Sequence, residues 1–162
     1  MCEDVDLTHK AHLPILTAIY KKYSGRRTLP GSKPSMSLEE FRDLCQIVGL
    51  VNDNFATREI DLCFNLAMMT QVDELYKKRH MDMSFVEFIE AIARAADLAS
   101  IEVESVEGEE NRIDSTTLPL ADKILNAMRL LFKQCPSSLQ SNFRLPTKES
   151  VEAMKYKKGS NK

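Results

Sequence analysis

A six-residue phrase that occurs twice constrains the fold of this chain more than any other feature. Residues 36–41 read MSLEEF and residues 83–88 read MSFVEF. In each copy a serine stands three residues before a glutamate, at the start of an apolar run. This spacing predicts a capping box, in which the hydroxyl accepts from the glutamate N–H and the carboxylate accepts from the serine N–H. We therefore expect two related helices, with Ser37, Glu40, Ser84 and Glu87 as their capping residues.

Four helices are expected around the two copies of the phrase. Apolar side chains recur at helical spacing in 13–23, in 38–48, in a segment that begins after Asn54, and from Phe85 onward. The third segment is apolar on more than half of its circumference, so we expect it to bury two sides and to continue toward Tyr76. The residues before Leu13 are polar and are expected to be loose. The fold class expected is all-α, with paired helix–loop–helix units at 10–98.

Two helix–loop–helix units in this order resemble the EF-hand family. The loop of that family carries oxygen ligands at positions 1, 3 and 5, a glycine at position 6 and a bidentate glutamate at position 12. Aligned on the repeated phrase, Met36 and Met83 take position 8, where the resemblance implies that the two loops pair. Glu40 and Glu87 take position 12. The resemblance covers a little over half of the chain.

The front half of each loop departs from the family pattern. The first loop, 24–40, contains three cations and no carboxylate before Glu39. The second loop, 68–87, contains carboxylates, but it also contains the basic cluster 77–79 and no glycine. Both loops exceed the twelve residues of the family, so we expect no bound metal or cofactor and interpret the position-12 glutamates as capping residues. The alternative is a calcium sensor with unconventional loops, whose ligands would be Glu40, Glu87, Asp73 and Asp82.

The composition changes after the paired units. Residues 99–117 are rich in glutamate and are expected to form a solvated acidic linker. Residues 118–135 then predict an amphipathic helix whose apolar face is too large to remain in water. We expect this helix to pack on the pair, and docking onto a separate protein is the alternative. The last segment, 136–162, predicts a polar and basic tail with a short helix from Thr147. The docking face of the amphipathic helix consists of Leu120, Ile124, Leu125, Met128, Leu131 and Phe132.

No sequence motif predicts enzymatic chemistry. The chain contains no G-x-S-x-G, no H-E-x-x-H and no dinucleotide-binding fingerprint. Its four cysteines show no C-x-x-C spacing, which argues against a zinc site, and Cys45 and Cys63 fall on apolar helix faces. A net charge of −2 gives no pull toward nucleic acid, and no apolar run is long enough to span a membrane. We expect a non-enzymatic cytoplasmic protein that binds neither nucleic acid nor membranes.

Methionine-rich surfaces suit adaptable binding grooves, and this chain contains eight methionines. The EF-hand resemblance implies a groove that takes an amphipathic helix, whereas simple filling of the core is the alternative for the methionines. We expect a calcium-independent adaptor that binds a protein, through an amphipathic helix or a cytoskeletal surface. Residues 68–75 also resemble calmodulin-like modules of ciliary and flagellar proteins in unicellular eukaryotes, which implies a location in the cytoskeleton, cilium or flagellum. The expected groove residues are Met36, Phe41, Phe64, Met68, Met69, Met83, Phe88 and Ile92.

Overall fold

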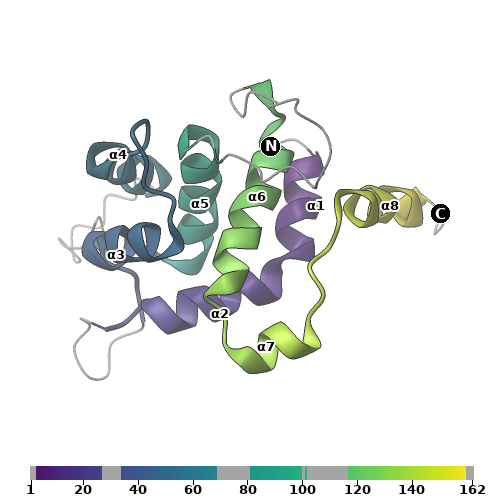
Figure 1. Cartoon of the computed structure of the whole chain (residues 1–162), viewed down its shortest axis with the longest axis horizontal. Helices are drawn as coiled ribbons and strands as arrows, with labels where there is room; N and C mark the ends of the chain where they lie inside the picture. Colours follow the sequence, from purple (N-terminus) through teal and green to yellow (C-terminus); the bar gives the residue numbers. More distant parts are fainter. Residues whose placement is uncertain (1–2, 27–33, 69–80, 100, 102–116, 160–162) are drawn as a thin grey trace, which may run out of the picture.

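The computed structural model describes residues 3–26, 34–68, 81–99, 101 and 117–159. All regular secondary structure in these ranges is helical (Figure 1), which confirms the all-α class. The helices are α1 (Glu3–Ala11), α2 (Leu13–Tyr23), α3 (Leu38–Val48), α4 (Thr57–Ala67), α5 (Phe85–Ala99), α6 (Leu120–Lys133), α7 (Ser137–Asn142) and α8 (Lys148–Gly159).

Several helix ends coincide with the signals in the sequence. α2 spans the predicted 13–23, with a proline in its first turn, where the missing N–H costs nothing. α3 ends at Gly49, whose φ of 81° is the left-handed conformation that glycine adopts without strain. α4 stops earlier than expected, because Met68 has an extended backbone with φ of −66° and ψ of 125°. The expected continuation toward Tyr76 lies outside the described residues.

α2, α3, α4 and α5 surround one apolar core. The ring centroids of Tyr20 and Phe88 are 5.4 Å apart and those of Phe41 and Phe64 are 6.1 Å apart, so ring contacts link α2 to α5 and α3 to α4. α4 packs against α5 and α3 against α4. The turn between α3 and α4 is fixed by Asn52, whose Oδ1 accepts from two backbone N–H groups and whose Nδ2 donates to the last carbonyl of α5.

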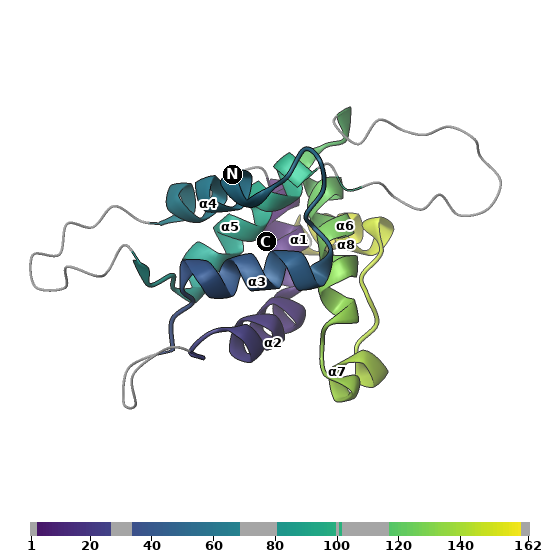
Figure 2. The same ribbon diagram turned by 60° about the vertical axis from the view of Figure 1, so that its left-hand side comes forward.

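α6 packs on the core that α2, α3, α4 and α5 surround. It contacts α5 most extensively and also contacts α1, α2 and α3. Figure 1 shows α6 running between α5 and α1, and Figures 1 and 2 show α7 beyond its far end. The expected acidic linker that precedes α6 lies almost entirely outside the described residues.

The expectation that the residues before Leu13 are loose is wrong, because they form α1. The acidic residues of this helix stand in its first turn and its basic residues in its last turn, which complements the helix dipole. Val5 and Leu7 are buried, and the Thr8 hydroxyl donates to the Asp4 carbonyl oxygen at 2.7 Å. The paired unit predicted at 10–98 therefore begins inside a helix.

The C-terminal segment is more ordered than a polar tail. α7 follows Pro136 and was not expected, whereas α8 begins one residue after the predicted Thr147. α8 lies beside α1, and its Val151 packs with Leu7 and Leu125. The first and last helices of the chain are therefore neighbours (Figure 1).

Candidate functional site

Two methionines join the loops that precede α3 and α5. Met36 and Met83 form an isolated antiparallel bridge, in which each N–H donates to the carbonyl oxygen of the other at 2.9 Å. Both side chains are fully buried. The first methionine of each copy of the repeated phrase is therefore bonded to the other.

Tyr20 ties α2 to the same bridge. Its phenolic OH donates to the Met83 carbonyl oxygen at 2.9 Å and lies 3.3 Å from that of Pro34. Beside it, the Ser35 hydroxyl donates to Asp82 Oδ1 at 3.1 Å. The two loops are therefore held together by backbone and side-chain bonds formed by the protein itself.

The Glu40 carboxylate closes the first loop. Oε2 accepts from the Ser37 N–H at 2.8 Å, which completes the capping box, while Oε1 accepts from the Arg26 N–H at 2.7 Å. Next to it, the Gly25 N–H donates to the Ser35 carbonyl oxygen at 2.9 Å, and Gly25 adopts a φ of 76°. Glu40 is only 3% exposed. Both of its oxygens therefore bind backbone N–H groups on the two sides of the loop.

Glu87 occupies the equivalent position before α5. Its Oε2 accepts from the Ser84 N–H at 2.7 Å and from the Ser84 hydroxyl at 2.6 Å. The return bond, from the Glu87 N–H to the Ser84 hydroxyl oxygen, is long at 3.5 Å. Both capping pairs are thus present. In each pair, the bond that the glutamate carboxylate accepts is shorter than the bond that the serine hydroxyl oxygen accepts.

The residues present fit a calcium ion poorly. Calcium needs six to eight oxygen ligands, including carboxylates. Both Glu40 oxygens face N–H donors, and Asp82 accepts from Ser35. Asp73 lies outside the described residues. Within the described ranges, no group of three or more His, Cys, Asp or Glu side chains could hold a metal ion.

The residues predicted to form a partner groove lie mostly in the core. Met36, Phe41, Phe64, Met83, Phe88 and Ile92 are buried. Met68 packs half-buried at the core's edge, and Met69 is outside the described residues. α6 helps to enclose this core through Ile124, Met128 and Leu131, which are fully buried, whereas Leu125 is buried in a separate cluster with Leu7 and Val151. Phe132 is half-buried with its ring 6.3 Å from that of Phe143, whereas Leu120 is 37% exposed.

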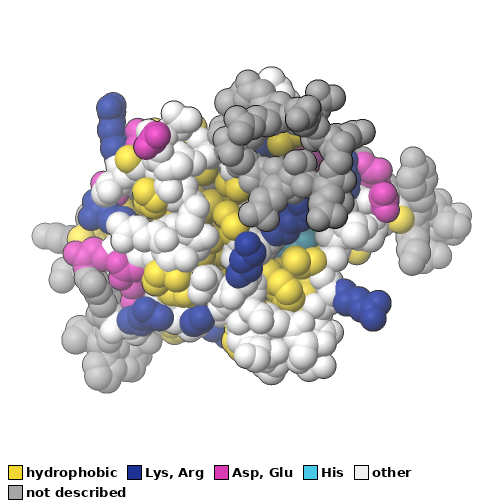
Figure 3. Space-filling model, viewed as in Figure 1, with side chains coloured by type: hydrophobic (Ala, Val, Ile, Leu, Met, Phe, Trp, Pro, Cys, Tyr) yellow, Lys and Arg dark blue, Asp and Glu magenta, His cyan; other side chains and the backbone are white. Residues whose placement is uncertain are grey.

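The exposed apolar surface lies elsewhere. Leu62 and Leu66 on α4 are 49% and 55% exposed, so the expectation that α4 buries two sides is wrong for these residues. Leu13 and Val86 are also exposed, and they line a cavity of about 380 Å³ between the α1–α2 junction, α4 and α5. A further apolar region lies between α3 and α6 (Figure 3).

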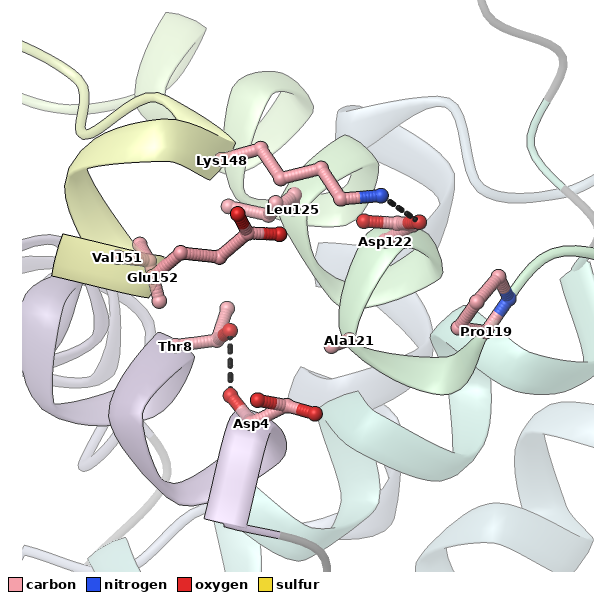
Figure 4. Close-up of a pocket in the computed structure, with 9 residues that line it drawn as sticks. All are labelled: Asp4, Thr8, Pro119, Ala121, Asp122, Leu125, Lys148, Val151 and Glu152. Carbon is pink, nitrogen blue, oxygen red and sulfur yellow. Dashed lines mark hydrogen bonds and ion pairs between the residues drawn. The ribbon is translucent and has the colours of Figure 1, made fainter. Parts of the chain in front are cut away.

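A second cavity, of about 200 Å³, lies between α1, α6 and α8. Figure 4 shows the carboxylates of Asp4, Asp122 and Glu152 around it. Lys148 pairs with Asp122 at 2.7 Å, and this pair raises the pKa of the lysine. The floor consists of Leu125 and Val151. This ion pair and its apolar floor attach α8 to α6.

The buried cysteines are poor nucleophiles. Burial raises the pKa of the Cys63 thiol to about 11 and that of Cys45 further still. Because the thiolate is the reactive form, neither residue is activated.

The sequence analysis overlooked His9 and His12. Both are buried at the junction of α1 and α2, and burial lowers the pKa of each. Their three-residue spacing on a polar segment gave no signal of burial.

Comparison with protein-family models, with curated proteins and with solved structures finds no match for this chain. None of the helices in the described ranges is both long and apolar enough to cross a membrane.

Proposed function

We propose that this chain is a calcium-independent, non-enzymatic protein-binding module built on an EF-hand-like pair. The reciprocal bridge between Met36 and Met83 supports the paired arrangement, since these are the residues that the repeated phrase assigns to position 8. The two capping boxes then start α3 and α5 at equivalent points.

The observation that carries calcium independence is the role of Glu40. A calcium loop needs its position-12 carboxylate free to bind the ion with both oxygens. In this chain Oε1 and Oε2 instead accept from the Arg26 and Ser37 N–H groups, which supports a loop that does not depend on calcium. Calcium would have to displace two charge-assisted hydrogen bonds in a buried site.

The binding surface of the module is the outer face of α4, which we define by Leu62 and Leu66. The two leucines stand one helical turn apart, which is the spacing of anchors that meet an amphipathic helix of a partner. α6 packs against α1, α2, α3 and α5 and covers the interior of the pair. The outer face of α4 is therefore the surface that we assign to a partner. The resemblance of 68–75 to ciliary and flagellar modules supports a cytoskeletal partner.

The test combines calorimetry with partner capture. We expect no heat of binding at micromolar calcium and the same captured proteins with calcium or with chelator. Leu62→Lys and Leu66→Lys should abolish capture, whereas Leu98→Lys, at an exposed leucine on α5, should not. Calcium binding that is lost in Glu87→Gln would favour the alternative, a calcium sensor, and equal capture by all variants would reject α4 as the surface.

A further inference from the structure

Two buried histidines stand where α1 meets α2. His9 is 7% exposed and His12 is 1% exposed. His12 Nδ1 lies 2.7 Å from the Thr8 carbonyl oxygen, so in the neutral ring this nitrogen carries the proton and donates it. His9 Nε2 is buried, and no described residue forms a hydrogen bond with it.

The surroundings of the two rings favour the neutral state. Burial lowers the pKa of His9, and a charge on His12 would lower it further. Asp6 and Glu90 act in the opposite direction, but Asp6 pairs with Lys10 at 2.5 Å and Glu90 pairs with Arg94 at 2.8 Å. Apolar side chains of α2, α4 and α5 line the rest of the cavity beside His9, where Glu87 is the remaining charged group.

A second set of charged groups lies where α1 meets α6 and α8. Asp4, Asp122, Lys148 and Glu152 surround the cavity of Figure 4, and Lys123 of α6 pairs with Asp97 at 2.7 Å. Lys123 of α6 therefore pairs with α5, and Lys148 of α8 pairs with Asp122 of α6.

Protonation would place two positive charges at this junction. Each imidazolium ring has two N–H donors, and His9 would gain a donor in an environment where one ring nitrogen already lacks a partner. Burial disfavours these charges more than the neighbouring carboxylates favour the one on His9, and the burial cost disappears when the rings reach water. The buried aliphatic side chains of α1 are Val5 and Leu7, so the release of α1 exposes little apolar surface.

We propose that His9 and His12 form an acid-sensitive latch, whose protonation releases α1 from α6 and α8. α8 follows α1, because its Val151 is buried against Leu7 and Leu125. The released state exposes Leu125 and leaves the four-helix core of α2 to α5 in place. This inference is independent of the partner surface on α4.

The expected size of the effect follows from proton linkage. The folded state favours neutral rings, so the stability from this preference is complete above the unfolded histidine pKa of about 6.5 and is lost as the pH falls below it. Between pH 7.5 and 5.0, each histidine raises the equilibrium constant for release of α1 by up to about 30-fold, and the pair by up to about 1,000-fold.

Native-state hydrogen exchange of the full chain measures this constant, after correction for the intrinsic pH dependence of exchange. Amides of 7–11 should lose protection by up to about 1,000-fold between pH 7.5 and 5.0, while amides of α3 change little. In His9→Leu, the amides of 7–11 should still lose protection by about 30-fold over this pH range. In the double variant His9→Leu with His12→Asn, their protection should change as little as that of the α3 amides. His80→Gln, at the third histidine of the chain, is the matched control and should behave like the unmodified protein.

Three results would overturn the latch. They are unchanged protection of 7–11 at pH 5.0, an equal loss in the double variant, and a parallel loss in α3. Should the double variant not fold, ring NMR of the unmodified protein decides. Midpoints of His9 and His12 below 6.5 that coincide with loss of α1 protection support the latch, and midpoints at or above 6.5 contradict it.

Discussion

Replacing Glu40 with glutamine tests whether this carboxylate closes the first loop without a metal ion. The two oxygens accept from the Arg26 N–H at 2.7 Å and the Ser37 N–H at 2.8 Å. Glutamine keeps the shape of the side chain but replaces one oxygen with an NH2 group. One backbone N–H then faces a donor instead of an acceptor, at a position that is 3% exposed.

The loss can be estimated from the two bonds. A hydrogen bond to a charged group contributes about 1.5–3 kcal/mol, and Glu40→Gln removes one such bond and takes the charge from the other. We expect the free energy of unfolding to fall by about 2–4 kcal/mol. The matched control is Glu59→Gln, because Glu59 has the same place in α4 but accepts one bond, from the Ala56 N–H at 3.1 Å, and is partly exposed. Its loss should be about 1 kcal/mol.

Urea denaturation followed by circular dichroism measures both losses. With a slope of about 2 kcal/mol per molar urea, Glu40→Gln should lower the midpoint by about 1–2 M. The midpoints of both variants and of the unmodified protein should be the same in chelator and in millimolar calcium. A loss in Glu40→Gln no larger than in Glu59→Gln, or a calcium-dependent rise that Glu40→Gln removes, would refute the reasoning.

Three further predictions address the core. Met128→Ala should lower the free energy of unfolding in urea by about 2–5 kcal/mol, because Met128 is fully buried on α6. Leu120→Ala, at a residue that is 37% exposed, should lower it by less than about 1 kcal/mol. Equal losses in the two variants would contradict the packing of α6. Tyr20→Phe should cost about 1 kcal/mol by the same assay, since it removes the bond to the Met83 carbonyl oxygen while Met36 still donates to that oxygen; no loss would show that the bond is unimportant. Because the pKa of Cys63 is raised to about 11, mass spectrometry should show alkylation at pH 8 roughly 100-fold slower in the native protein than in urea, and equal rates would contradict its burial.

The features predicted best from the sequence depend on neighbouring residues. A capping box needs a serine and a glutamate three places apart, and both boxes are present at Ser37 and Ser84. Gly49 ends α3 for the equally local reason that it adopts positive φ. The bridge between Met36 and Met83 is not local. The repeated phrase placed both methionines at equivalent positions, and only the EF-hand resemblance implied that they pair.

The features that were missed depend on contacts between distant segments. α1 consists largely of polar residues, and the burial of Thr8 and His9 follows from packing against helices that come much later in the chain. α7 carries no apolar stripe at all. The apolar face of α6 led us to expect that the helix packs on the pair, but the face alone does not distinguish a surface of this chain from a surface of another protein.

The placement of α1 has a consequence for biosynthesis. α1 is synthesised before α6 and α8, yet it packs against both of them. These contacts join segments that are far apart in the sequence, and contacts between such distant segments form slowly. Until translation reaches α6 and α8, α1 of the nascent protein lacks these two packing partners, and chaperones could bind it throughout that interval.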